Sequence, residues 1–225
     1  PKILEVTLHN GVDPVSGRKV GLETGDPRGF GNYDELYAAF MKQVRYFVDM
    51  KVRVSNYIDR MFAKYAPATF LSLFIDDCIA KGRDYYNCGP RYNTTYIQCT
   101  GLGTITDSLV TLKKHIFEDK RWSMDELLKA MADNFEGAEA MRQTILNRTP
   151  FFGNDDEYAD SIAVKVFDDL YDTIEGKPNT KGECFHLNML STTCHVYFGK
   201  VMGATPNGRL AGRAISDGTS PSHGA

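Results

Sequence analysis

The chain lacks any long hydrophobic run and any excess of positive charge. Its longest strongly apolar stretch, Ala68 to Ile75, contains Thr69 and Ser72 and is far shorter than the ~20 residues that a membrane-spanning helix needs. Lys and Arg number 26 against 29 Asp and Glu, which gives a formal net charge of -3. Proteins that bind nucleic acid use positive charge to neutralise phosphates. We therefore predict neither a membrane span nor a nucleic-acid partner.

Cysteine pairs at a disulfide-forming or metal-binding spacing are also missing. The 225 residues include five cysteines, an odd number without a CxxC pair. This set predicts neither a disulfide framework nor a zinc site. It is typical of a reducing, intracellular setting, so we expect a cytoplasmic protein. The 42% hydrophobic and 24% charged residues that are present have the composition of a folded globular domain.

The two ends of the chain do not look like the ends of a protein. The sequence begins Pro1-Lys2-Ile3-Leu4, without an initiator methionine or a signal-peptide pattern. Its last residues, 222–225, lie in a glycine-containing stretch rather than after a helix or strand. We interpret residues 1–225 as one internal fragment of a longer protein.

The spacing of apolar residues predicts helices that alternate with isolated strands. Segments with apolar residues three and four apart predict helices, among them 33–65 and 123–135, where Ser123 and Glu126 have the spacing of a capping box. The other predicted helices are 2–10, 76–81, 104–118, 138–147 and 154–176. Segments rich in β-branched and aromatic residues predict strands over 69–75, 91–100, 184–190 and 195–199. Glycines and prolines leave 12–32 without a regular element. The alternation predicts an α/β fold with a parallel sheet.

Two local patterns could support chemistry, but each has a simpler interpretation. Cys184 with His186, and Cys194 with His195, combine a thiol with an imidazole, as a nucleophile or a soft-metal site would. Cys184 and His186 share one face of a strand, and packed interior residues are the favoured interpretation. The loop at residues 101–104 lies between a strand and a helix and resembles an anion-binding turn, yet it lacks the last glycine of GxGxxG.

Four longer stretches together resemble the glycyl radical enzyme family, which is pyruvate formate-lyase-like. They occur in a fixed order from Gly82 onward, and the combination is more specific than any single glycine motif. The stretches are Gly89-Pro90-Arg91-Tyr92-Asn93 with residues 101–109, residues 113–117, residues 198–209 with the run Gly203-Ala204-Thr205-Pro206-Asn207-Gly208-Arg209, and residues 214–224.

The resemblance implies a fragment, mainly the second half, of a ten-stranded α/β barrel that encloses a radical. In that family a glycine holds a stable radical, installed by a radical SAM activating enzyme, and passes it to a cysteine in a CxE signature. No cysteine of this chain has Glu two residues later, and the surroundings of the radical glycine are missing. The resemblance therefore implies no catalytic residue here and no bound cofactor, and it places the glycyl radical domain elsewhere in the full chain.

Within the family, the sequence looks most similar to the branch that dehydrates hydroxyproline. The choline and glycerol lyase branches are close alternatives. The expected partners are a small-molecule substrate, the activating enzyme and a second copy in a homodimer. Thr192 and Thr193 are the leading substrate-binding candidates, because strand ends face the cavity of a barrel and a hydroxyl can donate or accept a hydrogen bond. His195 and Asn188 are weaker candidates. Arg209 could bind an anion or a neighbouring carbonyl, and we favour the carbonyl.

Two alternatives from other classes remain open. In the first, the piece is a structural or interaction module without catalysis of its own. In the second, the loop at residues 101–104 binds a nucleotide, which predicts binding of phosphate ligands. An upstream CxE signature and a downstream glycyl motif in the full-length sequence would favour the enzyme over the structural module.

Overall fold

The computed structural model describes residues 1–222, which form two compact units. The first unit comprises Pro1–Tyr46, Cys99–Asp169 and the residues from Met189 onward, and the second comprises Phe47–Gln98 and Leu170–Asn188. Two long helices, α2 (Tyr33–Tyr65) and α8 (Glu157–Ile174), contribute residues to both units. Among the described residues, no helix combines the length and apolar character needed to cross a membrane.

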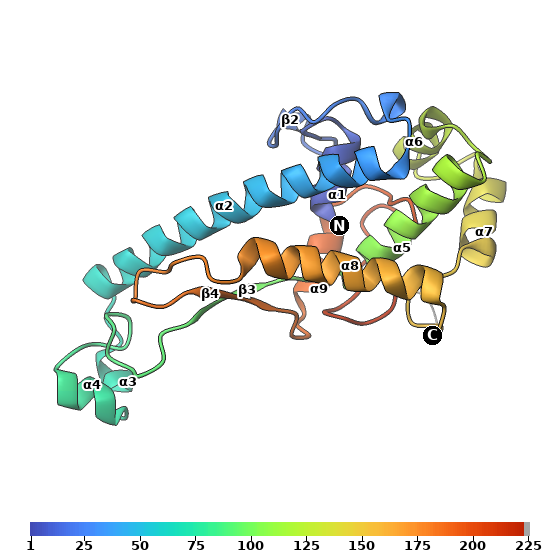
Figure 1. The fold of residues 1–225 in the computed structure, drawn as a ribbon. Helices are drawn as coiled ribbons and strands as arrows, with labels where there is room; N and C mark the ends of the chain where they lie inside the picture. The colour runs from blue at the N-terminus through green and yellow to red at the C-terminus, as the bar shows by residue number, and fades with distance from the viewer. Residues whose placement is uncertain (223–225) are drawn as a thin grey trace. The chain divides into compact units, whose positions relative to one another are not determined.

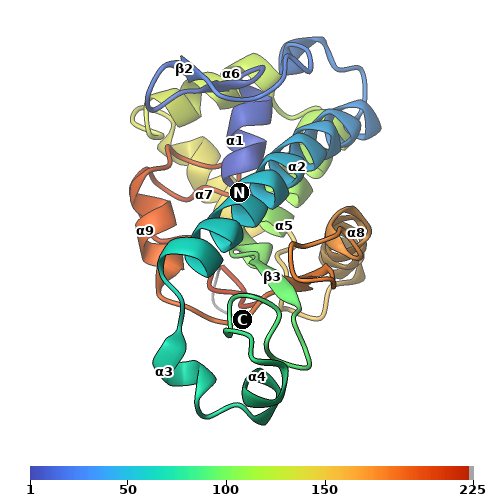
Figure 2. The ribbon, with the colours of Figure 1, turned by 90° about the vertical axis from the view of Figure 1, so that its left-hand side faces the viewer.

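The first unit is mainly helical. Figures 1 and 2 show α1, α6 and α7 gathered around α5. The helices that lie wholly in this unit are α1 (Lys2–Leu8), η1 (Pro27–Gly29), α5 (Leu102–Thr111), η2 (Leu112–Glu118), α6 (Met124–Ala132), α7 (Glu139–Arg148) and α9 (Cys194–Lys200). A short antiparallel pair, β1 (Val12–Asp13) and β2 (Arg18–Lys19), follows α1.

Helix α5 is the centre of the first unit, because every one of its ten residues is buried. Burial on all sides requires small side chains where the backbone of another segment passes close by. Gly103 meets this requirement, since a Cβ atom there would lie 2.5 Å from the carbonyl oxygen of Ser220. Helix α5 continues as the π-helical segment η2, which keeps Leu112 and His115 buried.

Several helix ends follow from their local sequence. The predicted capping box is present at α6, where the Ser123 hydroxyl accepts from the Glu126 N–H and the Glu126 carboxylate accepts from the Ser123 N–H. Gly11 lies just after α1 with φ +89°, the left-handed conformation that glycine adopts without strain. The structure also confirms the predicted helix over 33–65 as α2.

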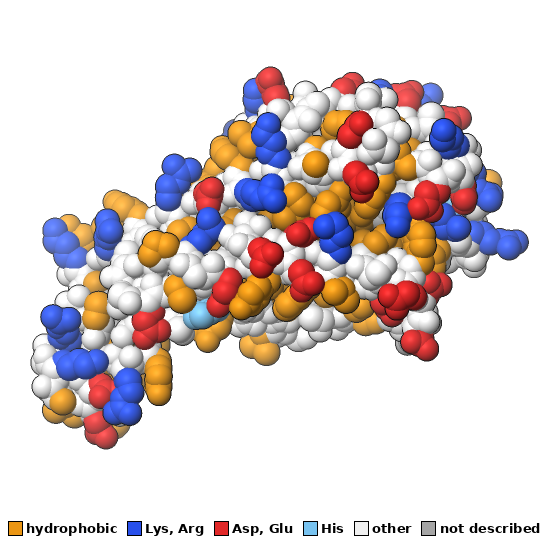
Figure 3. Space-filling view, in the orientation of Figure 1, with side chains coloured by type: hydrophobic (Ala, Val, Ile, Leu, Met, Phe, Trp, Pro, Cys, Tyr) orange, Lys and Arg blue, Asp and Glu red, His pale blue; other side chains and the backbone are white. Residues whose placement is uncertain are grey.

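The second unit contains a parallel pair of strands, β3 (Thr95–Gln98) and β4 (Phe185–Asn188), which lie side by side in Figure 1. Tyr96 pairs with His186 in this register, and Phe185 is fully buried. Helices α3 (Thr69–Ser72) and α4 (Asp76–Lys81) complete the unit. This unit leaves many large hydrophobic side chains exposed, among them Phe70 and Phe74. Figure 3 shows hydrophobic side chains among charged ones on the face in view.

Two predicted strands are helices in the structure. Residues 69–75 form α3 and a turn, and Phe70 and Leu73 are 75% and 63% exposed, so the segment does not have the burial that its apolar composition indicated. Residues 195–199 belong to α9, whose first turn is fixed by a contact between His195 and the carbonyl oxygen of Thr192 three residues earlier. The prediction that 12–32 holds no regular element was also wrong, because β1, β2 and η1 lie there.

The α/β class and the parallel pairing are confirmed. Within residues 1–222 the sheets have two strands each, β1 with β2 and β3 with β4.

Candidate functional site

A cavity of about 380 Å³ in the first unit brings together the start of α5, the start of α9 and the segment that follows Asn207. Its walls carry hydroxyl, amide, imidazole, carboxylate and guanidinium groups, which suit a small polar ligand. The lining residues are Thr104, His195, Asn207, Arg209, Ala214, Ile215, Ser216, Asp217, Ser220, Pro221 and Ser222.

Asp217 fixes the turn that precedes α9. Its Oδ1 atom accepts from the Thr192 N–H at 2.9 Å and lies 3.5 Å from Nδ1 of His195. The same Nδ1 atom is 2.7 Å from the carbonyl oxygen of Thr192. Because a carbonyl oxygen only accepts, Nδ1 carries the proton in this contact, and the neutral ring then has Nε2 as its acceptor. His195 therefore enters the cavity wall in one defined orientation.

The two threonines of the turn differ in their surroundings. Thr192 is half-buried, and its hydroxyl oxygen is shielded from solvent without a hydrogen-bond partner among the described residues. A buried hydroxyl without a partner costs free energy unless a ligand supplies one. Thr193 is exposed and is the residue before α9, where its hydroxyl makes no capping hydrogen bond. Neither threonine is among the residues that line the cavity of about 380 Å³, and Thr192 differs from Thr193 in its shielded hydroxyl.

Two hydroxyl side chains and one main-chain hydrogen bond hold the cavity segment against α5. The Thr104 N–H donates to the Ser216 hydroxyl at 2.9 Å, and the Ser216 N–H donates to the Thr104 hydroxyl at 2.8 Å. The Leu102 N–H donates to the carbonyl oxygen of Gly218 at 3.2 Å. Asp217 lies between these two anchors, so its carboxylate is held in place by its chain neighbours.

Arg209 binds backbone carbonyls, which is the interpretation that we favoured from the sequence. Its guanidinium donates to the carbonyl oxygens of Gly203, Leu210 and Arg213, and its Nε–H donates to the Thr205 hydroxyl at 3.2 Å. Burial lowers the pKa of Arg209 from its ordinary value. Since these donors are engaged, Arg209 organises the loop rather than binding an external anion.

Asp107 is an acid of this region whose pKa is strongly shifted. It is fully buried in α5, and burial raises the pKa of its carboxyl to about 7, against the opposing effects of the Phe152 N–H and the Ser222 hydroxyl. The Phe152 N–H donates to its Oδ1 atom at 2.9 Å. A carboxyl that titrates near neutrality is typical of functional sites.

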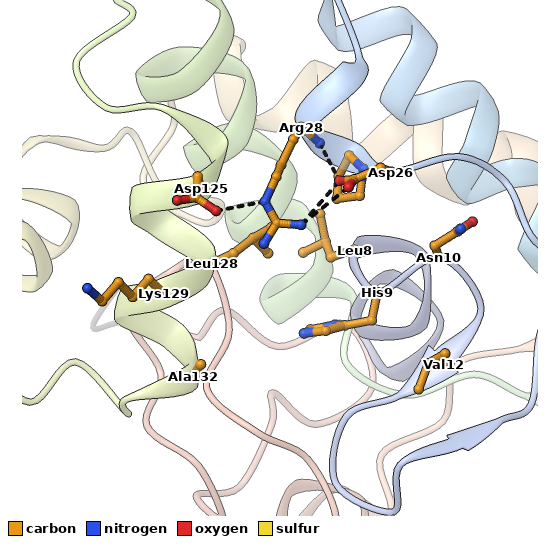
Figure 4. A pocket seen from close by; sticks show the side chains of 11 residues that line it. Leu8, His9, Asn10, Val12, Asp26, Arg28, Asp125, Leu128, Lys129 and Ala132 are labelled. Carbon is orange, nitrogen blue, oxygen red and sulfur yellow. Dashed lines mark hydrogen bonds and ion pairs between the residues drawn. The ribbon is translucent and has the colours of Figure 1, made fainter.

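A second cavity of about 550 Å³ in the first unit has a different chemistry. Figure 4 shows Arg28 at its centre, between the carboxylates of Asp26 and Asp125. The Nε atom of Arg28 lies 2.7 Å from Asp125, and Nη1 lies 3.3 Å from Asp26. The two carboxylates neutralise this cation, so the cavity offers little attraction for an anionic ligand.

The structure brings together two of the four predicted site residues. Thr192 and His195 share Asp217, and Thr193 lies next to them on the exposed side of the turn. Asn188 ends β4 in the second unit. Sequence reasoning missed Asp217, which stands 25 residues after Thr192 and was visible only as part of the 214–224 stretch. Over the described part of the chain, no three His, Cys, Asp or Glu residues are arranged to hold a metal ion.

Comparison with known proteins places the chain in a family. The family model described as "Pyruvate formate lyase-like" matches residues 1–199. Trans-4-hydroxy-L-proline dehydratase of Clostridioides difficile is 50% identical over 224 residues, which cover 100% of this chain and 28% of the relative. Isethionate sulfite-lyase of Oleidesulfovibrio alaskensis is 37% identical over 227 residues, with 99% and 27% covered.

Solved structures agree with the family match. The crystal structure of hydroxyproline dehydratase from Clostridioides difficile with trans-4-hydroxy-L-proline bound matches with a TM-score of 0.95 and 50% identity. Glycerol dehydratase from Clostridium butyricum, in its glycerol-bound form, matches with a TM-score of 0.92 and 33% identity. Each match covers 99% of this chain and 28% of the other.

The chain belongs to the pyruvate formate lyase-like family of glycyl radical enzymes. Its fold is the α/β fold of their structures, and the chain spans about 28% of the length of the dehydratase relative.

Proposed function

We propose that this chain is part of a glycyl radical dehydratase that converts trans-4-hydroxy-L-proline into 1-pyrroline-5-carboxylate and water. One observation carries the proposal: 50% identity over the whole chain to a hydroxyproline dehydratase, together with a TM-score of 0.95 to a structure that holds the substrate. The reaction class combines radical abstraction of hydrogen beside the ring nitrogen with loss of the 4-hydroxyl as water.

In this proposal the chain supplies the substrate-binding wall. The Thr192 hydroxyl, buried without a partner among the described residues, binds the amino or carboxylate group of the substrate. His195 offers Nε2 as an acceptor, because its Nδ1 proton faces the Thr192 carbonyl. Asp217 positions both residues. Thr193 and Asn188 take secondary polar contacts with the substrate.

The remaining parts of the enzyme lie outside this chain in the proposal. Residues 1–225 are an internal fragment, mainly the second half, of a ten-stranded α/β barrel, to which β3 and β4 contribute. The chain covers 28% of the dehydratase relative, and no cysteine in it has the CxE spacing, which supports a reactive cysteine and a radical glycine elsewhere in the longer protein. A radical SAM activating enzyme installs the radical, the active form is a homodimer, and the setting is the cytoplasm.

The test is anaerobic activation of the complete protein with an activating enzyme, followed by electron paramagnetic resonance and a substrate panel. We expect a carbon-centred doublet and turnover of trans-4-hydroxy-L-proline, but not of choline, glycerol, 1,2-propanediol or isethionate. A doublet with turnover of another panel member would overturn the substrate and keep the reaction class. If several activating enzymes produce no doublet, the radical assignment itself is wrong.

A further inference from the structure

Cys184 and His186 form a side-chain cluster in the second unit that the dehydratase proposal does not use. Residues two apart on an extended chain point to the same face. The Sγ atom of Cys184 lies 3.5 Å from Nε2 of His186, and the residue between them, Phe185, is fully buried on the other face. Cys184 and His186 are both half-buried in this chain.

Glu175 holds the other ring nitrogen of His186. Its Oε1 atom contacts Nδ1 of His186. Backbone bonds fix this arrangement, because the Gly176 N–H donates to the carbonyl oxygen of Phe185 at 3.2 Å and the Phe185 N–H donates to that of Lys177 at 2.8 Å. The end of α8 and the start of β4 are thereby tied together at the cluster.

The cluster has the order nucleophile, base and orienting carboxylate. A carboxylate on Nδ1 keeps the ring proton on that nitrogen, which leaves Nε2 as the acceptor for the Sγ–H of Cys184. We propose that Cys184 is a nucleophilic thiol, activated by His186 and Glu175, and that small disulfides modify it. The proposal is independent of the dehydratase activity.

The chemical step balances with the disulfide as the only co-reactant. His186 Nε2 takes the Sγ proton, and the Cys184 sulfur attacks one sulfur of the disulfide. A new S–S bond forms as the old one breaks, and the released thiolate takes the proton from the imidazole. Cys184 is oxidised to a mixed disulfide, and half of the small disulfide is reduced to a thiol.

The groups around the cluster fit this role better than a metal site. The Tyr96 ring on β3 lies 5.7 Å from the His186 ring, centre to centre. The two charged side chains next to the cluster have partners of their own. Lys177 forms an ion pair with Asp49 at 2.7 Å, and the Glu183 carboxylate accepts a hydrogen bond from the Asn93 N–H. Glu175 occupies the ring nitrogen that faces away from the thiol, so a metal at Cys184 and His186 would have only two protein ligands.

Site-resolved labelling of the complete protein tests the proposal, with Cys194 as an internal control. Cys194 is more exposed than Cys184. Within the described residues, no hydrogen bond joins its sulfur to an imidazole. We label the folded protein under anaerobic conditions with iodoacetamide, and separately with 2-hydroxyethyl disulfide, and follow each cysteine peptide by mass spectrometry. We expect Cys184 to react about 10-fold faster than Cys194 with both reagents. A faster reaction at Cys194 would show that exposure alone sets the rates.

Two variants separate activation from packing. His186→Gln removes the base, and we expect it to slow Cys184 labelling about 10-fold while the rate at Cys194 is unchanged. Glu175→Gln keeps the size of the orienting residue, and we expect it to slow Cys184 labelling less than His186→Gln does. The decrease in rate should be greater at pH 6.5 than at pH 9, where hydroxide replaces the base. Circular dichroism confirms folding of each variant. Equal rates at Cys184 in wild type and His186→Gln, with both folded, would overturn the proposal.

Discussion

The two regions that pair cysteine with histidine use the same side chains and reach different arrangements. At Cys184 and His186 the spacing of two on an extended chain places the thiol against the imidazole, 3.5 Å apart. At Cys194 and His195 the residues are adjacent on α9, and neighbours on a helix point about 100° apart. His195 turns instead toward the Thr192 carbonyl and Asp217. Secondary structure, rather than composition, decides which partner each histidine has.

The two regions also differ in what supports them. Backbone bonds between the end of α8 and β4 hold Glu175 opposite His186. The Thr192, His195 and Asp217 group instead depends on side chains, because Ser216 bonds to Thr104 and the loop before it is organised by buried Arg209. A site held by side chains is open to disruption by single substitutions.

The largest expected effect is on stability, from Arg209→Met. The guanidinium donates to three part-buried backbone carbonyls of the loop, and its loss removes all three of these bonds, although the Leu210 carbonyl also accepts from the Arg213 N–H. We expect a loss of about 3 kcal/mol in the free energy of unfolding, measured by denaturant unfolding of the complete protein. Arg213→Met is the matched control, because that side chain is exposed. Equal stability of the two variants would show that the loop does not depend on the Arg209 side chain.

Asp217→Ala is expected to have the next largest effect, on catalysis. The substitution releases both the Thr192 N–H and the His195 ring, and misplacement of such groups by about 1 Å can cost about 100-fold in rate. We expect a decrease of that size in kcat/KM for trans-4-hydroxy-L-proline. Asp217→Asn retains an oxygen acceptor and should lose less. Asp168→Ala removes an exposed carboxylate on α8 and should match wild type. A similar loss in Asp168→Ala would remove the case for a specific role of Asp217.

Thr192→Val compared with Thr193→Val separates the two leading substrate-binding candidates. Valine keeps the branched shape of threonine and removes only the hydroxyl. A hydrogen bond to a charged substrate group contributes about 1.5 kcal/mol or more, so we expect KM to rise about 10-fold in Thr192→Val. The exposed Thr193 hydroxyl should matter little. The reverse order in steady-state kinetics would reassign the contact to Thr193.

Local sequence was enough to predict features that depend on local interactions. The bounds of α2, the capping box at Ser123 and the turn at Gly11 each follow from residues within a few positions. The carbonyl role of Arg209 was also predicted, because its four partners lie within six residues of it. In these cases the sequence neighbours are also the spatial neighbours.

Features that depend on distant residues were not predicted. Asp217 reaches Thr192 across 25 residues, and Glu175 reaches His186 across 11, so spacing along the chain did not reveal either pair. The packed-interior interpretation of Cys184 and His186 was wrong in detail, since both are half-buried. Residues 69–75 and 195–199 were predicted as strands from β-branched and aromatic composition. The first segment instead forms α3 and a turn with Phe70 and Leu73 exposed, and the second belongs to α9.

The smallest expected effect concerns pH and tests whether the buried polar group of α5 contains a titrating acid. The pKa of Asp107 is raised by burial to about 7, compared with about 3.9 in an unfolded chain. The folded state therefore binds a proton that the unfolded state has already released, and its stabilising effect, complete below pH 3.9, is lost as the pH rises through 7. We expect the free energy of unfolding to fall by about 1 kcal/mol between pH 6 and pH 8 through this group.

Asp107→Asn isolates that contribution. The amide keeps an oxygen for the Phe152 N–H and cannot ionise, so the variant should lack this part of the pH dependence and become relatively more stable than wild type as the pH rises. Denaturant unfolding of both proteins at several pH values between 5 and 8 measures the difference. Parallel curves over that range would mean that the carboxyl keeps an ordinary pKa in the folded protein, and that α5 is surrounded by polar groups which tolerate a buried negative charge.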